Sequence, residues 1–220
     1  MKRLLIAVCL ALFVAPISHA ADAAHLDLIG FSKNGAFVAF TQFGVRDPSG
    51  FPYVYTSFVA IKTNRLEAEL RGEISVDGAT TDQVRAKMRA QVAVAMKKYG
   101  IIAGNQGRFI GVTPMRINTT NSEFFALGST YGLDISTKPA ANTNEMCADP
   151  PQLLIVELTV GGQTRDLQRD TRLPTSRRCA FDYDLRSAHL YGRSLAVFVS
   201  YMTPGYEGPD FIWMVVTGML

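Results

Sequence analysis

The sequence has few of the residues that usually mark catalytic and metal sites. Its 220 residues include 3 cysteines, 3 histidines and 1 tryptophan. It contains no phosphate-binding loop, dinucleotide fingerprint or zinc-ligand spacing. Ser49 lies in "DPSGF", which is not a G-x-S-x-G elbow, and the loop leads to a strand rather than a helix. We therefore assign no catalytic residue, no metal ligand and no cofactor, and the sequence leans away from an enzyme.

A strong net charge is also missing. The chain has 22 basic and 19 acidic residues, for a formal charge of +3. Lys2 and Arg3 supply two of the positive charges and lie in the segment that we expect to be removed. The net charge of the remaining residues is close to zero, so the composition gives no reason to expect nucleic acid as a partner.

Long apolar runs are absent after the first 20 residues. Those residues combine the charged Lys2 and Arg3, the apolar core "LLIAVCLALFVA" and the small-residue end "SHA". This is the pattern of a secretory signal peptide cut after Ala20, whereas an uncleaved anchor would need a longer apolar run. We expect residues 1–20 to be the signal peptide, the protein to be periplasmic or secreted, and no transmembrane segment to remain after cleavage.

Two cysteines follow the expected cleavage site. Cys9 leaves with the signal peptide, and Cys147 and Cys179 remain. In an oxidising compartment such a pair is expected to form a disulfide. Two free thiols or half of a metal site are the alternatives, but neither His25 nor His189 is close to a cysteine in sequence.

The hydrophobic pattern favours β-strands joined by glycine-rich turns. Asn34-Gly35, between two alternating apolar runs, is a strong hairpin signal. Residues 65–72 allow either a strand or a short helical turn, and a loop is expected over Ser136–Pro151. The other expected strands are Leu26–Ser32, Ala36–Phe43, Tyr53–Ile61, Phe109–Ile117, Glu123–Leu127, Leu153–Val160, Tyr183–Leu190, Ser194–Met202 and Asp210–Thr217.

One helix is expected over residues 80–99. Thr80 and Gln83 form a capping-box pair, and Gly100 is placed to end the helix. Its apolar face comprises Val84, Met88, Val92, Ala95, Met96 and Tyr99. Its basic residues, Arg85, Lys87 and Arg89, could bind a membrane surface or a partner, but a packed helix with a solvated basic face is the favoured interpretation.

The two ends of the chain carry a weak internal repeat. "FVAF" at Phe37–Phe40 corresponds to "LAVF" at Leu195–Phe198, and "DPSGFPY" corresponds to "PGYEGPD". The acids of these loops could bind Ca²⁺ if the loops lie at the same end of the sheet. Alternatively, Asp47 and Asp210 are turn-forming acids that bond their own backbone amides. The candidate binding-loop residues are Arg46, Asp47, Ser49, Tyr53, Tyr206, Glu207 and Asp210.

Two resemblances follow from these motifs. "FSKNGAFVAF" resembles the "FSPDGxxxAF" hairpin of TolB-like or WD40-like propeller blades. The same stretch, with "RRCAFDYDLRSAHLYG" and "PGYEGPDFIWMVV", resembles the bacterial secreted proteins grouped as domain of unknown function 2259. Pro48 departs from that family's pattern, which has glycine there, so the turn geometry could differ. The resemblance implies a compartment and a fold, and no reaction.

The sequence thus predicts a single mainly β domain over residues 21–220. Its antiparallel meanders would form a propeller-like or sandwich arrangement, with one amphipathic helix packed on the sheet. The expected function is a non-enzymatic binding or structural module that acts through contacts with envelope proteins. The alternative is an envelope enzyme or a Ca-binding protein that uses the acids of the two Gly/Pro loops.

Overall fold

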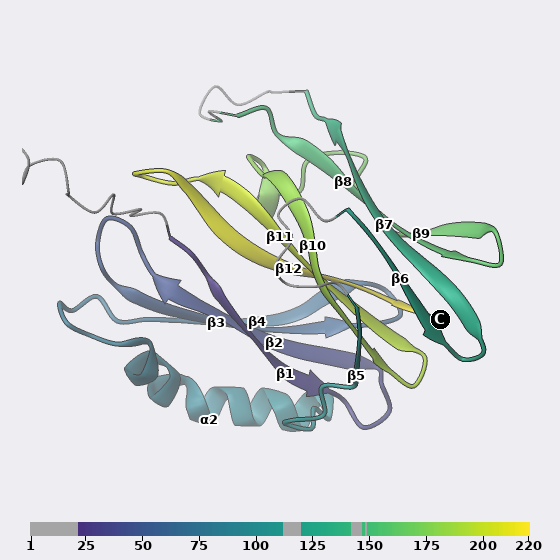
Figure 1. Cartoon of the computed structure of the whole chain (residues 1–220). Helices are drawn as coiled ribbons and strands as arrows, with labels where there is room; N and C mark the ends of the chain where they lie inside the picture. The colour runs from purple at the N-terminus through teal and green to yellow at the C-terminus, as the bar shows by residue number, and fades with distance from the viewer. Residues whose placement is uncertain (1–21, 112–119, 142–146, 148) are drawn as a thin grey trace, which may run out of the picture.

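Three antiparallel sheets and one long helix make up the part of the chain that the structure describes (Figure 1). The computed structural model describes residues 22–111, 120–141, 147 and 149–220. The predicted signal peptide, residues 1–20, lies outside these ranges. The prediction of a mainly β fold with antiparallel meanders and one packed helix is confirmed.

The first sheet is a meander of four strands in the order β1-β2-β3-β4. The hairpin expected at Asn34-Gly35 joins β1 to β2. Gly35 has φ 70°, and the Asn34 side-chain oxygen accepts a hydrogen bond from the Ala36 amide at 3.1 Å. Residues 65–72, which allowed two interpretations, form a strand. The bounds are β1 His25–Phe31, β2 Phe37–Val45, β3 Pro52–Ala60 and β4 Arg65–Glu73.

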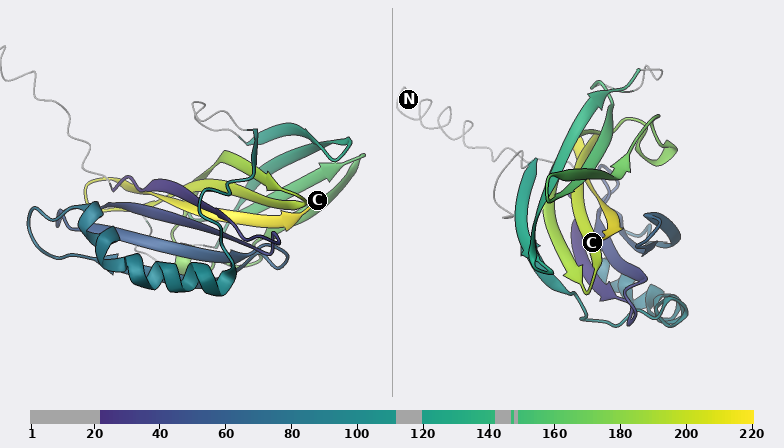
Figure 2. Two further views of the ribbon diagram at one scale, coloured as in Figure 1. Left: turned by 90° about the horizontal axis from the view of Figure 1, so that it is seen from below. Right: turned by 90° about the vertical axis from the view of Figure 1, so that its right-hand side faces the viewer.

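Helix α2, Thr81–Tyr99, lies along one face of this sheet (Figure 2). Both hydrogen bonds of the predicted capping box between Thr80 and Gln83 are present, and Gly100 ends the helix with φ 63°. Val84 and Met88 are buried against the sheet. The remaining residues of the predicted apolar face pack beside them: Val92, Ala95, Met96 and Tyr99.

The other two sheets also have four strands each. The second has the order β12-β11-β10-β5 and the third β6-β7-β8-β9. A short 3-10 helix, Thr175–Arg177, precedes β10. The bounds are β5 Arg108–Gly111, β6 Asn121–Ala126, β7 Ser129–Pro139, β8 Gln152–Val160, β9 Gln163–Arg169, β10 Phe181–Tyr191, β11 Ser194–Pro204 and β12 Pro209–Met219.

The second sheet is packed between the other two, so both of its faces are covered. Along β11, Ala196 and Phe198 face the first sheet, while Leu195 and Val197 face the third. Phe40 of β2 meets Phe198 edge to face, with ring centroids 5.6 Å apart. Residues 194–201 of β11 are all buried, as expected for a strand covered on both sides. The sequence left open a propeller-like and a sandwich arrangement. In both arrangements sheets stack face to face, as the three sheets do here.

Two sequence predictions need correction around β7. The predicted loop Ser136–Pro151 was wrong at its start, because β7 continues to Pro139, which pairs with Gln152 of β8. No strand was predicted from Ser129, although Tyr131, Leu133 and Ile135 alternate and are buried. The polar residues after Ile135 are exposed. They therefore remain in the strand because their backbone pairs with β8, and not because their side chains are buried. Of the predicted strand Phe109–Ile117, the part after Gly111 lies outside the described residues.

The predicted disulfide between Cys147 and Cys179 is present, with Cα atoms 5.3 Å apart. Close to it, Arg177 is only 8% exposed. Its guanidinium donates to both carboxylate oxygens of Asp170, at 2.9 and 3.0 Å, and to the Tyr183 hydroxyl at 2.8 Å. The buried charge of Arg177 is therefore paired with Asp170. These hydrogen bonds hold in place the segment that carries Cys179. Within the described ranges, no helix is both long and apolar enough to cross a membrane.

Candidate functional site

The two Gly/Pro-rich loops meet at the same end of the molecule. The first follows Val45 and ends where Pro52 begins β3, and the second joins Pro204 of β11 to Pro209 of β12. The Asp47 carboxylate accepts a hydrogen bond from the Glu207 amide at 3.1 Å. This bond joins the two loops. The interpretation of Asp47 as a turn-forming acid instead expected it to bond a backbone amide of its own turn.

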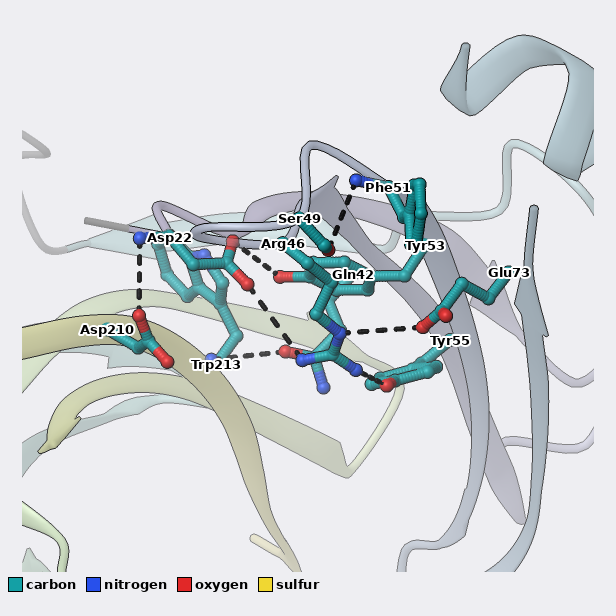
Figure 3. A network of polar contacts seen from close by, with 10 residues as sticks. All are labelled: Asp22, Gln42, Arg46, Ser49, Phe51, Tyr53, Tyr55, Glu73, Asp210 and Trp213. Atoms are coloured by element: carbon teal, nitrogen blue, oxygen red, sulfur yellow. Dashed lines mark hydrogen bonds and ion pairs between the residues drawn. The ribbon is translucent and has the colours of Figure 1, made fainter. Parts of the chain in front are cut away.

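A short segment, residues 22–24, lies beside β12, next to the two loops. Asp22 accepts a hydrogen bond through its carbonyl oxygen from the Phe211 amide at 2.8 Å, and the Ala24 amide donates to the Phe211 carbonyl at 3.0 Å. The indole of Trp213 donates to the Ala24 carbonyl at 2.6 Å. Residues 22–24 are thus fixed beside β12, and Asp22 points toward the first sheet (Figure 3).

Asp22 is the centre of a buried polar network. Its side chain is 6% exposed and accepts a hydrogen bond from the Tyr53 hydroxyl at 3.0 Å. Its backbone amide donates to the Asp210 carboxylate at 3.2 Å. Gly44 allows this approach, because a Cβ atom there would lie 2.8 Å from an Asp22 carboxylate oxygen and 2.9 Å from the Tyr53 hydroxyl. Gly44 of β2, Tyr53 of β3 and Asp210 of β12 therefore converge on Asp22.

The environment of the network raises several pKa values. Burial raises the pKa of Asp22, the hydrogen bond from Tyr53 opposes this, and the negative charge of Asp210 adds to it. Burial also raises the pKa of Asp210. Burial and the neighbouring Asp22 raise the pKa of Tyr53, so its phenol stays protonated and able to donate. Both acids hold a proton more tightly than an ordinary aspartate.

Arg46 connects this network to β3 and β4. Its guanidinium lies 4.4 Å from the centroid of the Tyr53 ring and hydrogen-bonds the Tyr55 hydroxyl. It is 3.6 Å from a Glu73 carboxylate oxygen and 3.9 Å from an Asp22 carboxylate oxygen. Its positive charge is therefore used within the protein, by stacking and by ion pairs.

Sequence reasoning missed half of this network. It assigned no role to Asp22, Tyr55 or Glu73, nor to the contact in which the Gln42 side chain accepts from the Trp213 amide at 3.3 Å. Gln42 gave a signal, since it is a polar residue on the strand face that Val38 and Phe40 share with it. Asp22 gave none, because its partners are distant in sequence.

The tips of the loops are exposed, unlike the network beneath them. Tyr206 of the second loop is 74% exposed, and Val45, the last residue of β2 before the first loop, is 51% exposed. Ser49 is exposed and its hydroxyl accepts from the Phe51 amide at 3.4 Å, which orders the first loop internally. Glu207 contributes its backbone amide to the network, while the residue itself is exposed. The seven predicted residues differ in exposure: Tyr53 is buried, Arg46, Asp47 and Asp210 are half-buried, and Ser49, Tyr206 and Glu207 are exposed.

Neither a metal cluster nor a histidine base is built from the described residues. Across the ranges given above, no group of three or more His, Cys, Asp or Glu residues is placed to hold a metal ion. His189 lies away from the loops, between Phe109 and Phe198, with its ring nitrogen 3.1 Å from the Gln106 carbonyl. Burial lowers the pKa of this half-buried imidazole, which favours its neutral form.

The fold and the site define a layered, disulfide-containing β protein with two loops joined at one end. The chain belongs to the family described as "Predicted secreted protein (DUF2259)", whose pattern matches residues 39–219. The family resemblance seen in the sequence is confirmed, and the match includes both loops but not Asp22. No curated protein and no solved structure shows a significant match to the chain.

Proposed function

We propose that this protein is an exported, non-enzymatic binding or structural module that acts through protein contacts at the paired loops. The observation that carries the proposal is the joining of the two loops next to an exposed aromatic side chain. The Asp47 carboxylate accepts from the Glu207 amide and so holds the loops together, and the neighbouring Tyr206 is 74% exposed. Function often lies in loops that a rigid scaffold positions, and exposed tyrosine is enriched at protein interfaces.

Export of the protein is supported by its family and by the disulfide. The finer assignment to the periplasm, and cleavage after Ala20, remain part of the proposal. Envelope proteins are the partners that this location would offer.

Site-specific photo-crosslinking in the native host tests the proposal. A photoreactive residue replaces Tyr206, and the control replaces Val94, which is 71% exposed on helix α2. We expect a discrete adduct from position 206 that excess purified protein competes away, and none from position 94. The same yield of adducts from both positions, or no adduct from position 206, would contradict the proposal.

One observation favours the alternative, an enzyme or Ca-binding protein that uses the loop acids. The loops do meet, and Asp22, Asp47 and Asp210 lie close enough to influence one another electrostatically. However, each of these carboxylates accepts a hydrogen bond from a protein group. Calorimetric titration with Ca²⁺ separates the two proposals, since saturable binding that Asp47→Asn abolishes would favour the alternative.

A further inference from the structure

A groove lies between helix α2 and the first sheet, on the face opposite the loop network. Its volume is about 300 Å³. Thr41, Val54 and Thr56 form its floor, and all three are buried in the sheet. The helix supplies its apolar wall, which consists of Met88, Val92, Ala93 and Met96.

The floor and the wall offer a ligand almost no free hydrogen-bonding groups. The hydroxyls of Thr41 and Thr56 bond each other at 3.1 Å, which uses one of their two O–H donors. The remaining floor and wall residues are apolar. Such a surface fits the hydrocarbon part of a ligand and does not suit a sugar or a nucleotide, whose polar groups would lose their hydrogen bonds to water.

The mouth of the groove is cationic. Arg85 and Arg89 are four residues apart on the helix, so they lie on the same face. Arg85 pairs with Asp27 at 2.6 Å, and its guanidinium lies 3.9 Å from the centroid of the Phe43 ring. Its Nε atom is buried without a hydrogen-bond partner. Arg89 is exposed and forms no ion pair with any of the described residues, so one positive charge at the mouth is not neutralised.

We propose that this groove binds a medium-chain fatty acid, with the hydrocarbon chain between α2 and the sheet and the carboxylate at Arg89. The volume is at the lower end of the range for small-molecule sites and leaves room for about eight to ten carbon atoms, if each takes roughly the space of a water molecule. Arginine suits the head group because its planar donors match a carboxylate. This site is separate from the paired loops, so its failure would leave the proposed function untouched.

Calorimetric titration of the exported protein with decanoate, below the concentration at which decanoate forms micelles, tests the proposal. We expect saturable binding at one site, weaker binding of decanol and no binding of acetate. Dioctanoyl phosphatidylglycerol distinguishes a free fatty acid from a lipid with the same kind of acyl chain. Absence of saturable decanoate binding, or a preference for the phospholipid, would overturn the assignment.

Three variants locate the binding site. Arg89→Ala should weaken decanoate binding about tenfold and leave decanol unchanged, since it removes a charge-assisted contact with the head group. Ala93→Phe fills the groove and should abolish binding of both. Lys87→Ala removes a positive charge from the same helix outside the groove and should change neither. All three residues are exposed, so the variants should fold, which thermal unfolding checks. Decanoate binding that neither Arg89→Ala nor Ala93→Phe affects would also overturn the proposal.

Discussion

At the scale of single residues, the most consequential side chain is Asp22. It is buried, its carboxylate accepts from Tyr53, and Asp210 and Asp47 raise its pKa further. A carboxyl in such surroundings binds its proton more tightly in the folded chain than in the unfolded chain. Its effect on stability therefore depends on pH with a definite sign.

Asp22→Asn should change the pH dependence of stability. Since the folded pKa lies above the ordinary value of 3.8, the contribution of Asp22 to the free energy of unfolding is greatest below that pH. It then falls as the pH rises through the folded pKa. Asparagine does not titrate, so the wild-type value minus the Asp22→Asn value should decrease between acidic and neutral pH. Urea unfolding of both proteins over that range measures the difference, and a flat or rising difference would argue against a raised pKa.

Tyr53→Phe should destabilise the protein by about 1–3 kcal/mol, because it leaves the buried carboxylate without its hydroxyl donor. Tyr206→Phe is the matched control, since it removes the hydroxyl from a residue that is 74% exposed. It should change the free energy of unfolding by less than about 0.5 kcal/mol. Chemical denaturation compares the two variants, and equal effects would mean that the Asp22 contact contributes little.

At the scale of elements, helix α2 is positioned by a glycine in the strand beneath it. Gly72 of β4 lies under Val84 and Met88, the two buried residues of the helix. A Cβ atom at Gly72 would lie 2.8 Å from Met88 Cγ and 2.9 Å from Val84 Cγ1. The close approach of helix and sheet, and with it the shape of the groove, depends on the missing side chain.

Gly72→Ala should therefore cost about 1–3 kcal/mol, through overpacking between the helix and the sheet. Gly132→Ala, in β7, adds the same methyl group where the nearest atom is 3.7 Å away, so it should be neutral or slightly stabilising. Thermal or urea unfolding of the pair measures the difference. If the two variants have the same stability, the helix is not held by this contact.

At the scale of the whole molecule, the disulfide restrains a long part of the chain. Cys147 and Cys179 are 32 positions apart in sequence. On the chain-entropy account, closing such a loop stabilises the fold by roughly 3–4 kcal/mol. The double variant Cys147→Ser/Cys179→Ser should lose about that amount in urea unfolding. A reducing agent should weaken the wild-type protein similarly and leave the double variant unchanged. An effect of the agent on the variant would show that it acts elsewhere.

Much of the fold could be predicted because its signals are local. The Asn34-Gly35 hairpin, the capping box of Thr80 and Gln83, and the apolar run of β11 each depend on neighbouring residues. The end of β7, residues 136–139, was missed because its exposed polar residues form a strand only through pairing with β8, which lies elsewhere in the sequence. The pairing of the sheets into layers has no local signal at all.

The candidate site was predicted in part for the same reason. The matching composition of the two loops pointed to Asp47 and Asp210. Their partners were not predictable, because Asp47 bonds a residue 160 positions away and Asp210 one 188 positions away. The sequence indicated which residues form the loops, but the joining of the loops is a tertiary property.

The covered second sheet also has a consequence for the order of folding. The inner face of the first sheet is buried by strands that are synthesised much later, as the bond from Ser194 to the Gly35 carbonyl shows across 159 positions. Until β11 and β12 are available, the apolar residues of that face, such as Phe40, stay in water, so the first meander and its helix should be less stable alone than in the whole molecule. The final packing of the first sheet would therefore wait until nearly the whole chain has been made, and the order of the strands would delay the complete fold of an exported chain.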